Sequence, residues 1–213
     1  MSQNNVIIRF DHVSFEYGIS KVILDEASFT VHRNSIVTII GQNGAGKSTI
    51  FKLLLKRLSP TSGKINLEEG TTVGIAEQMI PQDKLDLTIV DYFKTALPEK
   101  EYGIEGDIRK VFKSVILNIP LDRNVRFLSG GQKARLLLAY ALITNPDVLL
   151  LDEPINNLDK EGVEFLTIFL MNYQKTCIVI SHDSDFLNCF TDGVLNLDIH
   201  TKKIEQFVGN YYD

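Results

Sequence analysis

One stretch, GQNGAGKST from Gly41 to Thr49, constrains the fold of this 213-residue chain more than any other part. It contains the pattern G-x-x-x-x-G-K-[ST] and lies between two segments of different character. The preceding residues, SIVTII at 35–40, form the continuous β-branched run of a strand buried on both faces. The following residues, KSTIFKLLLKRL at 47–58, place apolar side chains at a helical period. The sequence therefore predicts a strand, a glycine-rich loop and a helix in succession.

A loop in this position has the composition of a phosphate cradle. Glycines let the backbone curl with its N–H groups pointing inward, and the start of the helix adds partial positive charge. We expect Lys47 to reach the β and γ phosphates of a nucleotide, and we expect the Ser48 hydroxyl to bind Mg²⁺. The other loop residues expected at the nucleotide are Gly41, Asn43, Gly44, Ala45, Gly46 and Thr49.

Strand patterns dominate the N-terminal third and helical patterns follow. Residues 5–17 and 22–31 read as strands, and KINLE and VGIAEQ, joined by EGTT, suggest a hairpin that ends near Gln78. From about residue 80 to 145 the hydrophobic pattern is all-helical, with no strand expected. The helical patterns there are 87–97, 105–117 and 131–143.

Strands and helices alternate again after this region, which indicates a parallel sheet with right-handed crossovers. The expected elements are a strand at 147–153, a helix at 160–173, a strand at 176–183, a short helix at 184–190 and a closing hairpin over 193–209. We therefore expect one domain over residues 1–213, with an α/β core, antiparallel strands beside it and a helical insert at about 80–145.

Composition narrows the class of protein. The net charge of −5 argues against a generally basic nucleic-acid binder, and the longest apolar run, at 136–143, is too short to cross a membrane. No signal peptide is recognisable at the start of the chain. Cys177 and Cys189 fit no disulfide or metal pattern, so we expect both to be buried in a protein of the reducing cytoplasm.

Two carboxylates end the strand predicted at 147–153. We expect this strand to run beside the one before the glycine loop, so that Asp152 can hold Mg²⁺ through water. Adjacent strand residues point to opposite faces, but the chain turns at Pro154, so Glu153 can face the γ-phosphate. There it can act as the base for an attacking water.

One phosphate site is enough for one nucleotide, so a second glycine-rich stretch, LSGGQ from Leu128 to Gln132, must serve another purpose. Together with the phosphate loop it resembles the ATP-binding cassette ATPases over essentially the whole chain. The resemblance implies a P-loop NTPase with a RecA-like parallel-sheet core, an antiparallel β subdomain and a helical subdomain. It also implies a head-to-tail pair of cassettes, in which Ser129, Gly130 and Gly131 close over the partner's ATP while Gln132 steadies the loop. The helix start near Gly131 favours such an anion.

Four further positions match the family. Tyr17 resembles the aromatic residue that stacks on adenine, although an exposed tyrosine at a strand end reads the same way. Gln78 resembles the residue that touches Mg²⁺ and the attacking water, although a polar strand end is the simpler reading. His182 resembles the histidine that contacts the γ-phosphate. Asp159 resembles the aspartate that communicates across the dimer.

Three stretches indicate one branch of the family. LDEPINNLD at 151–159, SHDSDFL at 181–187 and GNY at 209–211 resemble the ABC-F proteins, which are soluble and generally act on ribosomes. Ile155 and Asn157 depart from the usual Thr and His. ABC-F proteins carry two cassettes, so we expect this chain to be the first cassette of a tandem protein, or else to pair with its own copy. The alternatives are the ATP-binding subunit of a membrane transporter and a non-catalytic ATP-gated clamp, against which Glu153 argues.

Overall fold

The computed structural model describes residues 5–18, 21–100, 102–156 and 158–209, so Asn157 and the tail after Gly209 lie outside it. In the described residues the strands form two sheets. The smaller sheet has the order β2-β1-β4, and both of its pairings are antiparallel. Its strands are β1 (Val6–Tyr17), β2 (Lys21–His32) and β4 (Ser62–Leu67). The antiparallel β subdomain is thus present.

The larger sheet has the order β5-β6-β7-β3-β8-β9. Neighbours from β5 to β8 are parallel, and β9 closes the sheet as an antiparallel hairpin with β8, as predicted. The strands are β3 (Ile36–Ile40), β5 (Val73–Ala76), β6 (Val148–Asp152), β7 (Thr176–Ile180), β8 (Gly193–Leu197) and β9 (Ile204–Val208).

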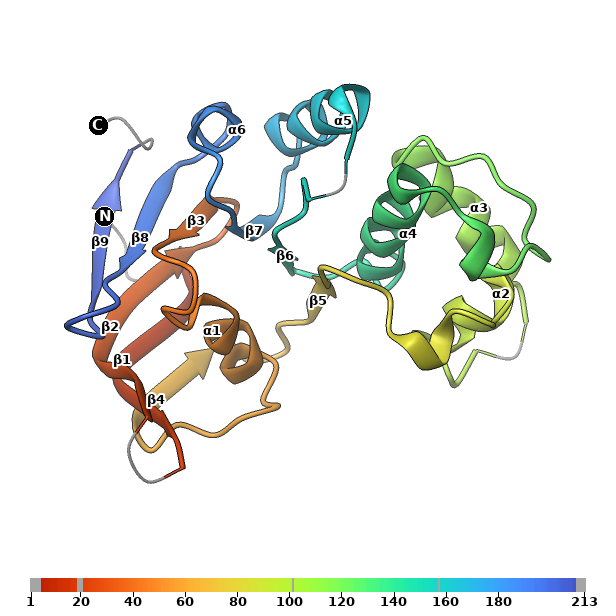
Figure 1. Cartoon of the computed structure of the whole chain (residues 1–213). Helices are drawn as coiled ribbons and strands as arrows, with labels where there is room; N and C mark the ends of the chain where they lie inside the picture. The colour runs from red at the N-terminus through yellow and green to blue at the C-terminus, as the bar shows by residue number, and fades with distance from the viewer. Residues whose placement is uncertain (1–4, 19–20, 101, 157, 210–213) are drawn as a thin grey trace.

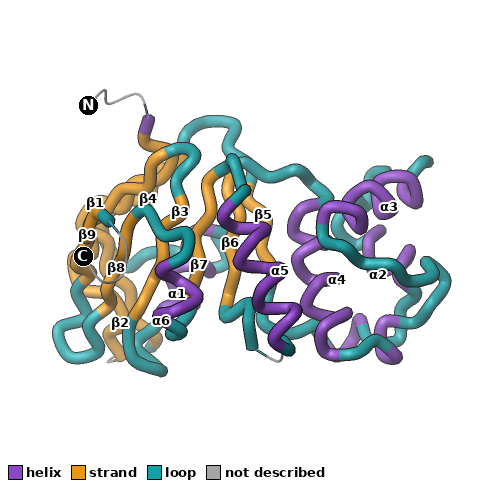
Figure 2. The backbone as a smooth tube through the Cα atoms, turned by 90° about the horizontal axis from the view of Figure 1, so that it is seen from above, coloured by secondary structure: helices purple, strands orange, loops and turns teal. Residues whose placement is uncertain are grey.

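The helices divide between the two ends of the molecule. Figure 1 and Figure 2 show α2, α3 and α4 gathered at one end, with β5 and β6 between them and the remaining strands. The helices are α1 (Lys47–Leu54), α2 (Ile89–Lys94), α3 (Ile104–Ser114), α4 (Gly130–Leu142), α5 (Lys160–Met171) and α6 (Ser184–Asn188), with short 3₁₀ turns at Gln82–Lys84 and Val125–Phe127. None of the helices in the described ranges is long and apolar enough to span a bilayer.

The parallel sheet is buried on both faces, which is why its central strands are continuous apolar runs. Alternate residues of β6 enter different cores. Leu149 and Leu151 join the core shared with α2 to α5, whereas Val148 and Leu150 join the core shared with α1 and the smaller sheet. The sheet therefore holds the helical insert on one side and the glycine loop's helix on the other.

The hairpin predicted over KINLE and VGIAEQ is wrong. β4 pairs with β1 in the smaller sheet, whereas β5 pairs with β6 in the larger one. The backbone N–H and the hydroxyl of Thr72 donate to Asp147 Oδ2 at 2.9 and 2.8 Å. These bonds hold the start of β5 beside the start of β6, so the two halves of the expected hairpin separate.

Two other expectations fail because of packing. β6 does not run beside β3, because β7, with all five residues buried, takes the central position between them. Cys177 is buried in β7, but Cys189 is exposed. In the chain around α6, Phe186 and Phe190 face the core, and this leaves Cys189 on the opposite side.

The first helix is also shorter than predicted. It ends at Leu54 rather than near Leu58, because Lys56 adopts the left-handed conformation with φ of 56°. The N–H of Arg57 then returns to the carbonyl of Lys52 at 2.9 Å, which closes the helix.

Candidate nucleotide-binding site

Glycines shape the loop between β3 and α1. Gly41, Gly44 and Gly46 have φ of 145°, 82° and 110°, a region that other residues rarely adopt. A Cβ on Gly41 would lie 2.5 Å from the backbone oxygen of Leu197 in β8, and one on Gly46 would overlap the side chain of Ile23 in β2. The loop is therefore wedged between the two sheets, and two of its glycines have no room for a side chain.

Lys47 begins α1 and closes the loop on itself. Its side chain is buried, and its Nζ donates to the carbonyl oxygens of Gly41 at 2.7 Å and Gln42 at 3.3 Å. Anionic oxygens make stronger, charge-assisted bonds than carbonyls do, so this ammonium group is placed to exchange its partners for phosphate. The other predicted loop residues divide by exposure: Ala45 and Thr49 are buried, while Asn43, Gly44 and Ser48 are exposed and accessible to a ligand.

Ser48 in α1 and Asp152 at the end of β6 meet, although β7 lies between β6 and β3, the strand that leads into the glycine loop. Burial raises the pKa of the Asp152 carboxyl above its usual value, and the neighbouring charge of Glu153 adds to this. A hydrogen bond with Ser48 and the positive charge of Lys47 oppose the rise. The structure thus brings together a hydroxyl, a partly buried carboxylate and an ammonium group at one point.

Glu153 turns out of the sheet toward His182. Its φ of 48° is left-handed, and its N–H donates to the carbonyl of Ile180 at 2.9 Å, so pairing with β7 continues past the end of β6. The Oε1 of Glu153 lies 2.9 Å from Nδ1 of His182. Its Oε2 is buried and has no hydrogen-bond partner within the described ranges. Such an oxygen is costly to bury and marks a position for a donor such as water.

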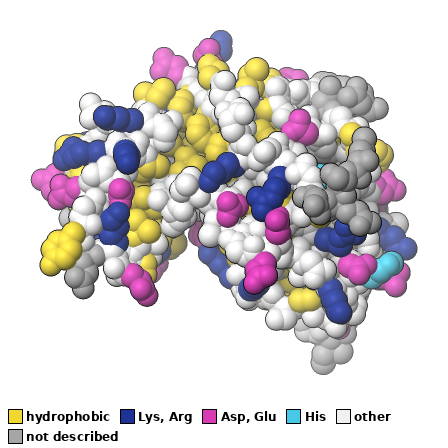
Figure 3. Space-filling view, turned by 180° about the vertical axis from the view of Figure 1, so that it is seen from behind, with side chains coloured by type: hydrophobic (Ala, Val, Ile, Leu, Met, Phe, Trp, Pro, Cys, Tyr) yellow, Lys and Arg dark blue, Asp and Glu magenta, His cyan; other side chains and the backbone are white. Residues whose placement is uncertain are grey.

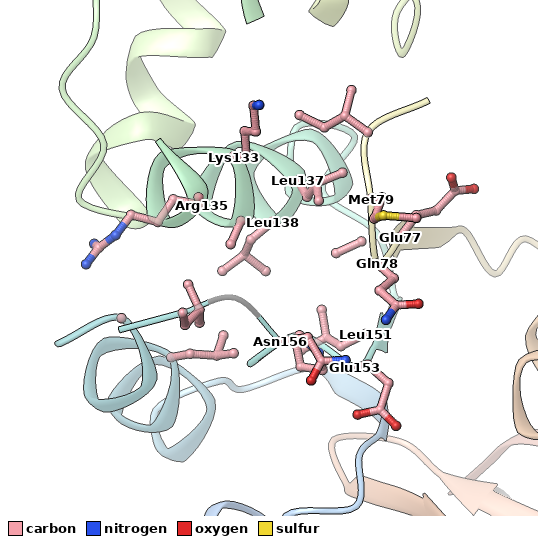
Figure 4. A pocket seen from close by; sticks show the side chains of 18 of the residues that line it. Glu77, Gln78, Met79, Lys133, Arg135, Leu137, Leu138, Leu151, Glu153 and Asn156 are labelled. Carbon is pink, nitrogen blue, oxygen red and sulfur yellow. The ribbon is translucent and has the colours of Figure 1, made fainter. Parts of the chain in front are cut away.

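A cleft of about 400 Å³ opens beside Glu153, between the helical insert and the parallel sheet. Gln78, just after β5, and Gly130, at the start of α4, line the same cleft. Figure 4 shows the side chains of Gln78, Asn156 and Glu153 gathered at one end of it. Seen from behind, the surface is hollowed between the helical end and the strands, with apolar side chains beside the hollow (Figure 3). Gln78 is exposed, so its amide is accessible from this cleft.

Tyr17 ends β1 on the side of the glycine loop. The residue is 38% exposed, and its ring meets the Phe15 ring edge-on, with centroids 4.9 Å apart. Across the sheet it pairs with Lys21, close in sequence to Ile23, which adjoins Gly46. The residue predicted to stack on adenine is therefore at the same end of the β1–β2 pair as the loop.

Ser129 caps α4. Its hydroxyl accepts the N–H of Gln132 at 3.2 Å, and Gln132 Oε1 accepts the N–H of Ser129 at 3.0 Å. Through this reciprocal capping box, Gln132 holds the start of the helix to the loop before it. A Cβ on Gly131 would meet no other heavy atom within 4 Å, so the surface of the loop is open.

Asp159 caps the next helix of the core. Its Oδ1 accepts the N–H of Gly162 at 2.9 Å at the start of α5. The Asp159 residue itself is exposed, so the cap leaves its position accessible to another molecule. Its predicted role across a dimer stays a prediction, beside this helix-capping contact.

The predicted site residues fall into two groups. One surrounds the glycine loop and includes Ser48, Asp152, Glu153 and His182. The other, around Ser129, belongs to the helical insert, and β5 and β6 lie between it and α1 (Figures 1 and 2). Among the residues that the structure describes, no hydrogen bond joins the Ser129–Gln132 capping box to the loop of Lys47.

Sequence reasoning missed residues that shape the glycine loop and the cleft. Ile23 and Leu197 wall the glycine loop, but both are ordinary apolar strand residues and carry no sequence signal. Asn156 lines the cleft. Its signal was present, because it is a polar residue between Ile155 and Leu158 in a stretch that already carries Asp152 and Glu153.

The donors of the first group fit Mg²⁺ and a triphosphate. Magnesium prefers oxygen ligands and is usually held by one or two protein groups together with phosphate and water. The candidates are the Ser48 hydroxyl, the Asp152 carboxylate and the Gln78 amide oxygen. In the described part of the chain no cluster of three or more His, Cys, Asp or Glu side chains could hold a metal unaided. The fit therefore depends on phosphate oxygens that complete the set.

A family model described as "ABC transporter" matches residues 24–156, more than half of the chain. The chain belongs to the ATP-binding cassette family. The matched segment contains the glycine loop, the Ser129 loop and Glu153, whereas Tyr17, Asp159 and His182 lie outside it.

Two relatives and one solved structure illustrate the range of similar cassettes. The zinc import ATP-binding protein ZnuC of Hydrogenovibrio crunogenus is 33% identical over 206 residues, covering 91% of this chain and 80% of the relative. The probable ATP-binding protein YheS of Escherichia coli K12 is 32% identical over 220 residues, covering 98% of this chain and 32% of YheS. The chain therefore spans about a third of YheS. The structure of cbiO1 from Clostridium perfringens, part of the ABC transporter complex cbiONQ, has a TM-score of 0.82 at 25% identity, covering 97% of this chain and 89% of cbiO1.

These likenesses confirm the predicted fold class, a P-loop NTPase of the cassette type. They include proteins named for import and a protein named only for ATP binding. The likenesses therefore establish the cassette fold but do not distinguish a transport function from other functions.

Proposed function

We propose that this cassette binds MgATP and hydrolyses it to ADP and phosphate in a site shared with a second cassette. The observation that carries the proposal is the juxtaposition of a buried Lys47 ammonium, the Ser48–Asp152 pair and the orphaned carboxylate oxygen of Glu153. Lys47 and the inward-facing amides of the loop hold the phosphates, and Tyr17 stacks on adenine. Ser48, Asp152 and Gln78 would hold Mg²⁺, which would supply positive charge against the triphosphate.

Glu153 has the position of a general base. Its unpaired Oε2 can accept a proton from water, and the 2.9 Å contact of its Oε1 with His182 fixes the side chain in one orientation. Gln78 lines the same cleft and orients the water, and His182 contacts the γ-phosphate. These groups place a proton acceptor beside the expected γ-phosphate, which favours a hydrolase over a purely ATP-gated clamp.

The Ser129 loop supports the shared site. Its helix start favours an anion, its surface at Gly131 is open, and it lies apart from the Lys47 loop of its own chain. A second cassette packed head to tail brings this loop to the other chain's nucleotide, with Asp159 near the junction. The partner is a second copy of this chain or a second cassette in a longer protein.

Mixing two complementary variants tests the shared site. Lys47→Ala removes the phosphate contact but leaves the Ser129 loop intact. Gly131→Asp fits its own chain, because a Cβ there meets nothing, but it places a negative charge toward the partner's phosphate. We expect each variant alone to be inactive and the 1:1 mixture to regain ATPase activity, because one intact site forms per mixed pair. A mixture that stays inactive, beside an active unmodified protein, contradicts the shared site.

We further propose that the cassette is of the ABC-F type and acts on ribosomes in the cytoplasm. The support is the LDEPINNLD and SHDSDFL stretches together with the match of YheS to 98% of the chain. The test is sedimentation of the full-length gene product with ribosomes in the presence of ATP, where Glu153→Gln should increase the bound fraction. Absence from the ribosomal pellet under both conditions contradicts this assignment.

The similarity to ZnuC favours a second candidate, the ATP-binding subunit of a membrane transporter. In that case the cassette docks on its membrane partner through the helical insert near Gln78. Co-purification of the full-length product with a multispanning membrane protein, and not with ribosomes, distinguishes this candidate from the first.

A further inference from the structure

The segments that enter and leave the helical insert are fastened to each other. The entry segment, residues 85–90, follows Gln78, and the exit segment, residues 121–126, precedes Ser129. Thr88 and Asn124 form an antiparallel bridge between the two segments. The backbone bonds that join them run from Arg126 N–H to Leu85 O at 2.8 Å, Val125 N–H to Leu87 O at 3.0 Å, Ile89 N–H to Arg123 O at 3.0 Å and Val90 N–H to Leu121 O at 3.1 Å.

Side chains of the exit segment converge on one residue, Asp86. Arg126 donates from Nε to Oδ1 at 2.7 Å and from Nη2 to Oδ2 at 2.8 Å, a bidentate pair. Asn124 donates from Nδ2 to the backbone oxygen of Asp86 at 2.7 Å. The bond with Arg126 lowers the pKa of Asp86, and the same bond raises the pKa of Arg126. Three directed bonds therefore fix the exit segment against the entry segment.

The Asp86–Arg126 pair contributes little to the stability of the fold. The side chains of Asp86 and Arg126 are 72% and 49% exposed, and exposed ion pairs contribute little to stability. The buried side chains of Leu121 and Val125 and the backbone bonds already hold the two segments together. The pair instead fixes the orientation of the exit segment, because a bidentate contact sets both the distance and the plane of its partners.

The orientation of the exit segment matters because Arg126 lies just before the Ser129 loop in the chain. The 3₁₀ turn Val125–Phe127 leads through the buried Leu128 to Ser129, the cap of α4. Val125 and Leu128 are buried, whereas Arg126 and Phe127 between them are exposed, so the core holds this part of the turn less directly. The bidentate bonds of Arg126 to Asp86 tie this exposed part of the turn, and with it the approach to Ser129, to the entry segment.

We propose that Asp86 and Arg126 are positioning residues that hold the Ser129 loop in the orientation needed to reach the partner's nucleotide. The inference rests on the shared site proposed above, and neither residue touches the nucleotide of its own chain. Loss of the pair should therefore impair the site of the partner cassette and spare the chain's own phosphate loop.

Arg126→Ala, mixed with Lys47→Ala, tests this. We expect Arg126→Ala alone to lose about tenfold in kcat with unchanged MgATP affinity, since small misplacements of positioned groups have effects of this order. Mixing with Lys47→Ala should restore turnover per intact site, because the Arg126→Ala chain then supplies only its phosphate loop. Lys94→Ala, which breaks the exposed Lys94–Asp91 pair of the same insert, is the matched control and should leave kcat unchanged.

Two results overturn the inference. One is unchanged kcat in Arg126→Ala, and the other is a defect that mixing with Lys47→Ala does not repair, because such a defect lies in the variant's own fold or phosphate loop. The Gly131→Asp and Lys47→Ala mixture run in parallel separates the two proposals. If that mixture regains activity while Arg126→Ala fails its test, only the positioning inference falls; if that mixture stays inactive, the shared site itself falls.

Discussion

Replacing Glu153 by glutamine tests two properties of this carboxylate, namely its cost to the stability of the fold and its role as a general base. The Glu153 side chain is 12% exposed, its Oε1 lies 2.9 Å from His182 Nδ1, and its Oε2 has no hydrogen-bond partner in the described chain. Glutamine has the same shape, so the substitution removes a negative charge and a proton acceptor and leaves the packing intact.

The structure sets the size of both effects. An unpaired buried polar atom costs about 1–3 kcal/mol, and more when it is charged. Glutamine relieves part of that cost, so we expect the unfolding free energy without nucleotide to rise by about 1 kcal/mol, or about 2–4 °C in Tm for a chain of this size. Loss of a general base should lower kcat by about 10²–10⁴-fold. MgATP affinity should persist, because Lys47 and Ser48 are untouched.

Calorimetric unfolding without nucleotide and steady-state phosphate release measure the two effects. The control is Glu69→Gln, which replaces an exposed carboxylate outside the glycine loop and should change neither quantity. A Glu153→Gln protein that unfolds several degrees below the unmodified chain would refute the reasoning about the orphaned oxygen. Turnover within about threefold of the unmodified protein would refute the assignment of the base.

Substitutions around the glycine loop test three more expectations. Lys47→Ala should weaken MgATP binding by about 10²-fold or more in titration calorimetry, since charge-assisted bonds are lost, and unchanged affinity contradicts the phosphate loop. Burial raises the pKa of Asp152, so the folded state binds its proton more tightly than the unfolded state, and the chain loses stability as pH rises above the ordinary value of 3.8. Asp152→Asn escapes that loss, so its Tm advantage without nucleotide should grow between about pH 4 and pH 7; a constant difference contradicts the cause given. Gly46→Ala should cost about 1–3 kcal/mol because φ is 110° and the methyl group meets Ile23, and Ile23→Ala should recover part of this cost. Equal costs in both backgrounds would show that Ile23 is not the obstacle.

Local features of the fold were predictable because neighbouring residues decide them. The glycine loop, with its buried strand before and helix after, follows from sequence that is adjacent in the chain, and so does the closing β8–β9 hairpin. The start of α4 was also predicted locally, near Gly131 from the helical pattern of 131–143, within one residue of the observed start at Gly130.

Strand partners were not predictable in the same way. β4 and β5 look like the two arms of a hairpin, but β4 pairs with β1, and β5 pairs with β6, which is distant in sequence and is joined to it by the bonds of Thr72 to Asp147. The central place of β7 likewise depends on which apolar strand is most completely buried, a property of the assembled sheet.

The candidate site shows the same limit. Motifs pointed to Glu153 and His182 separately, and their contact arises because β6 and β7 are neighbours and Glu153 extends their pairing to Ile180. The Asp86–Arg126 pair carries no motif, so nothing in the sequence pattern joins two residues so far apart in the chain.

A structure of the Glu153→Gln protein with MgATP tests the shared site most directly. We expect a head-to-tail pair of cassettes in which each triphosphate contacts Lys47 of one chain and Ser129 of the other. A triphosphate held by Lys47 alone, with every Ser129 facing solvent, would contradict the proposal.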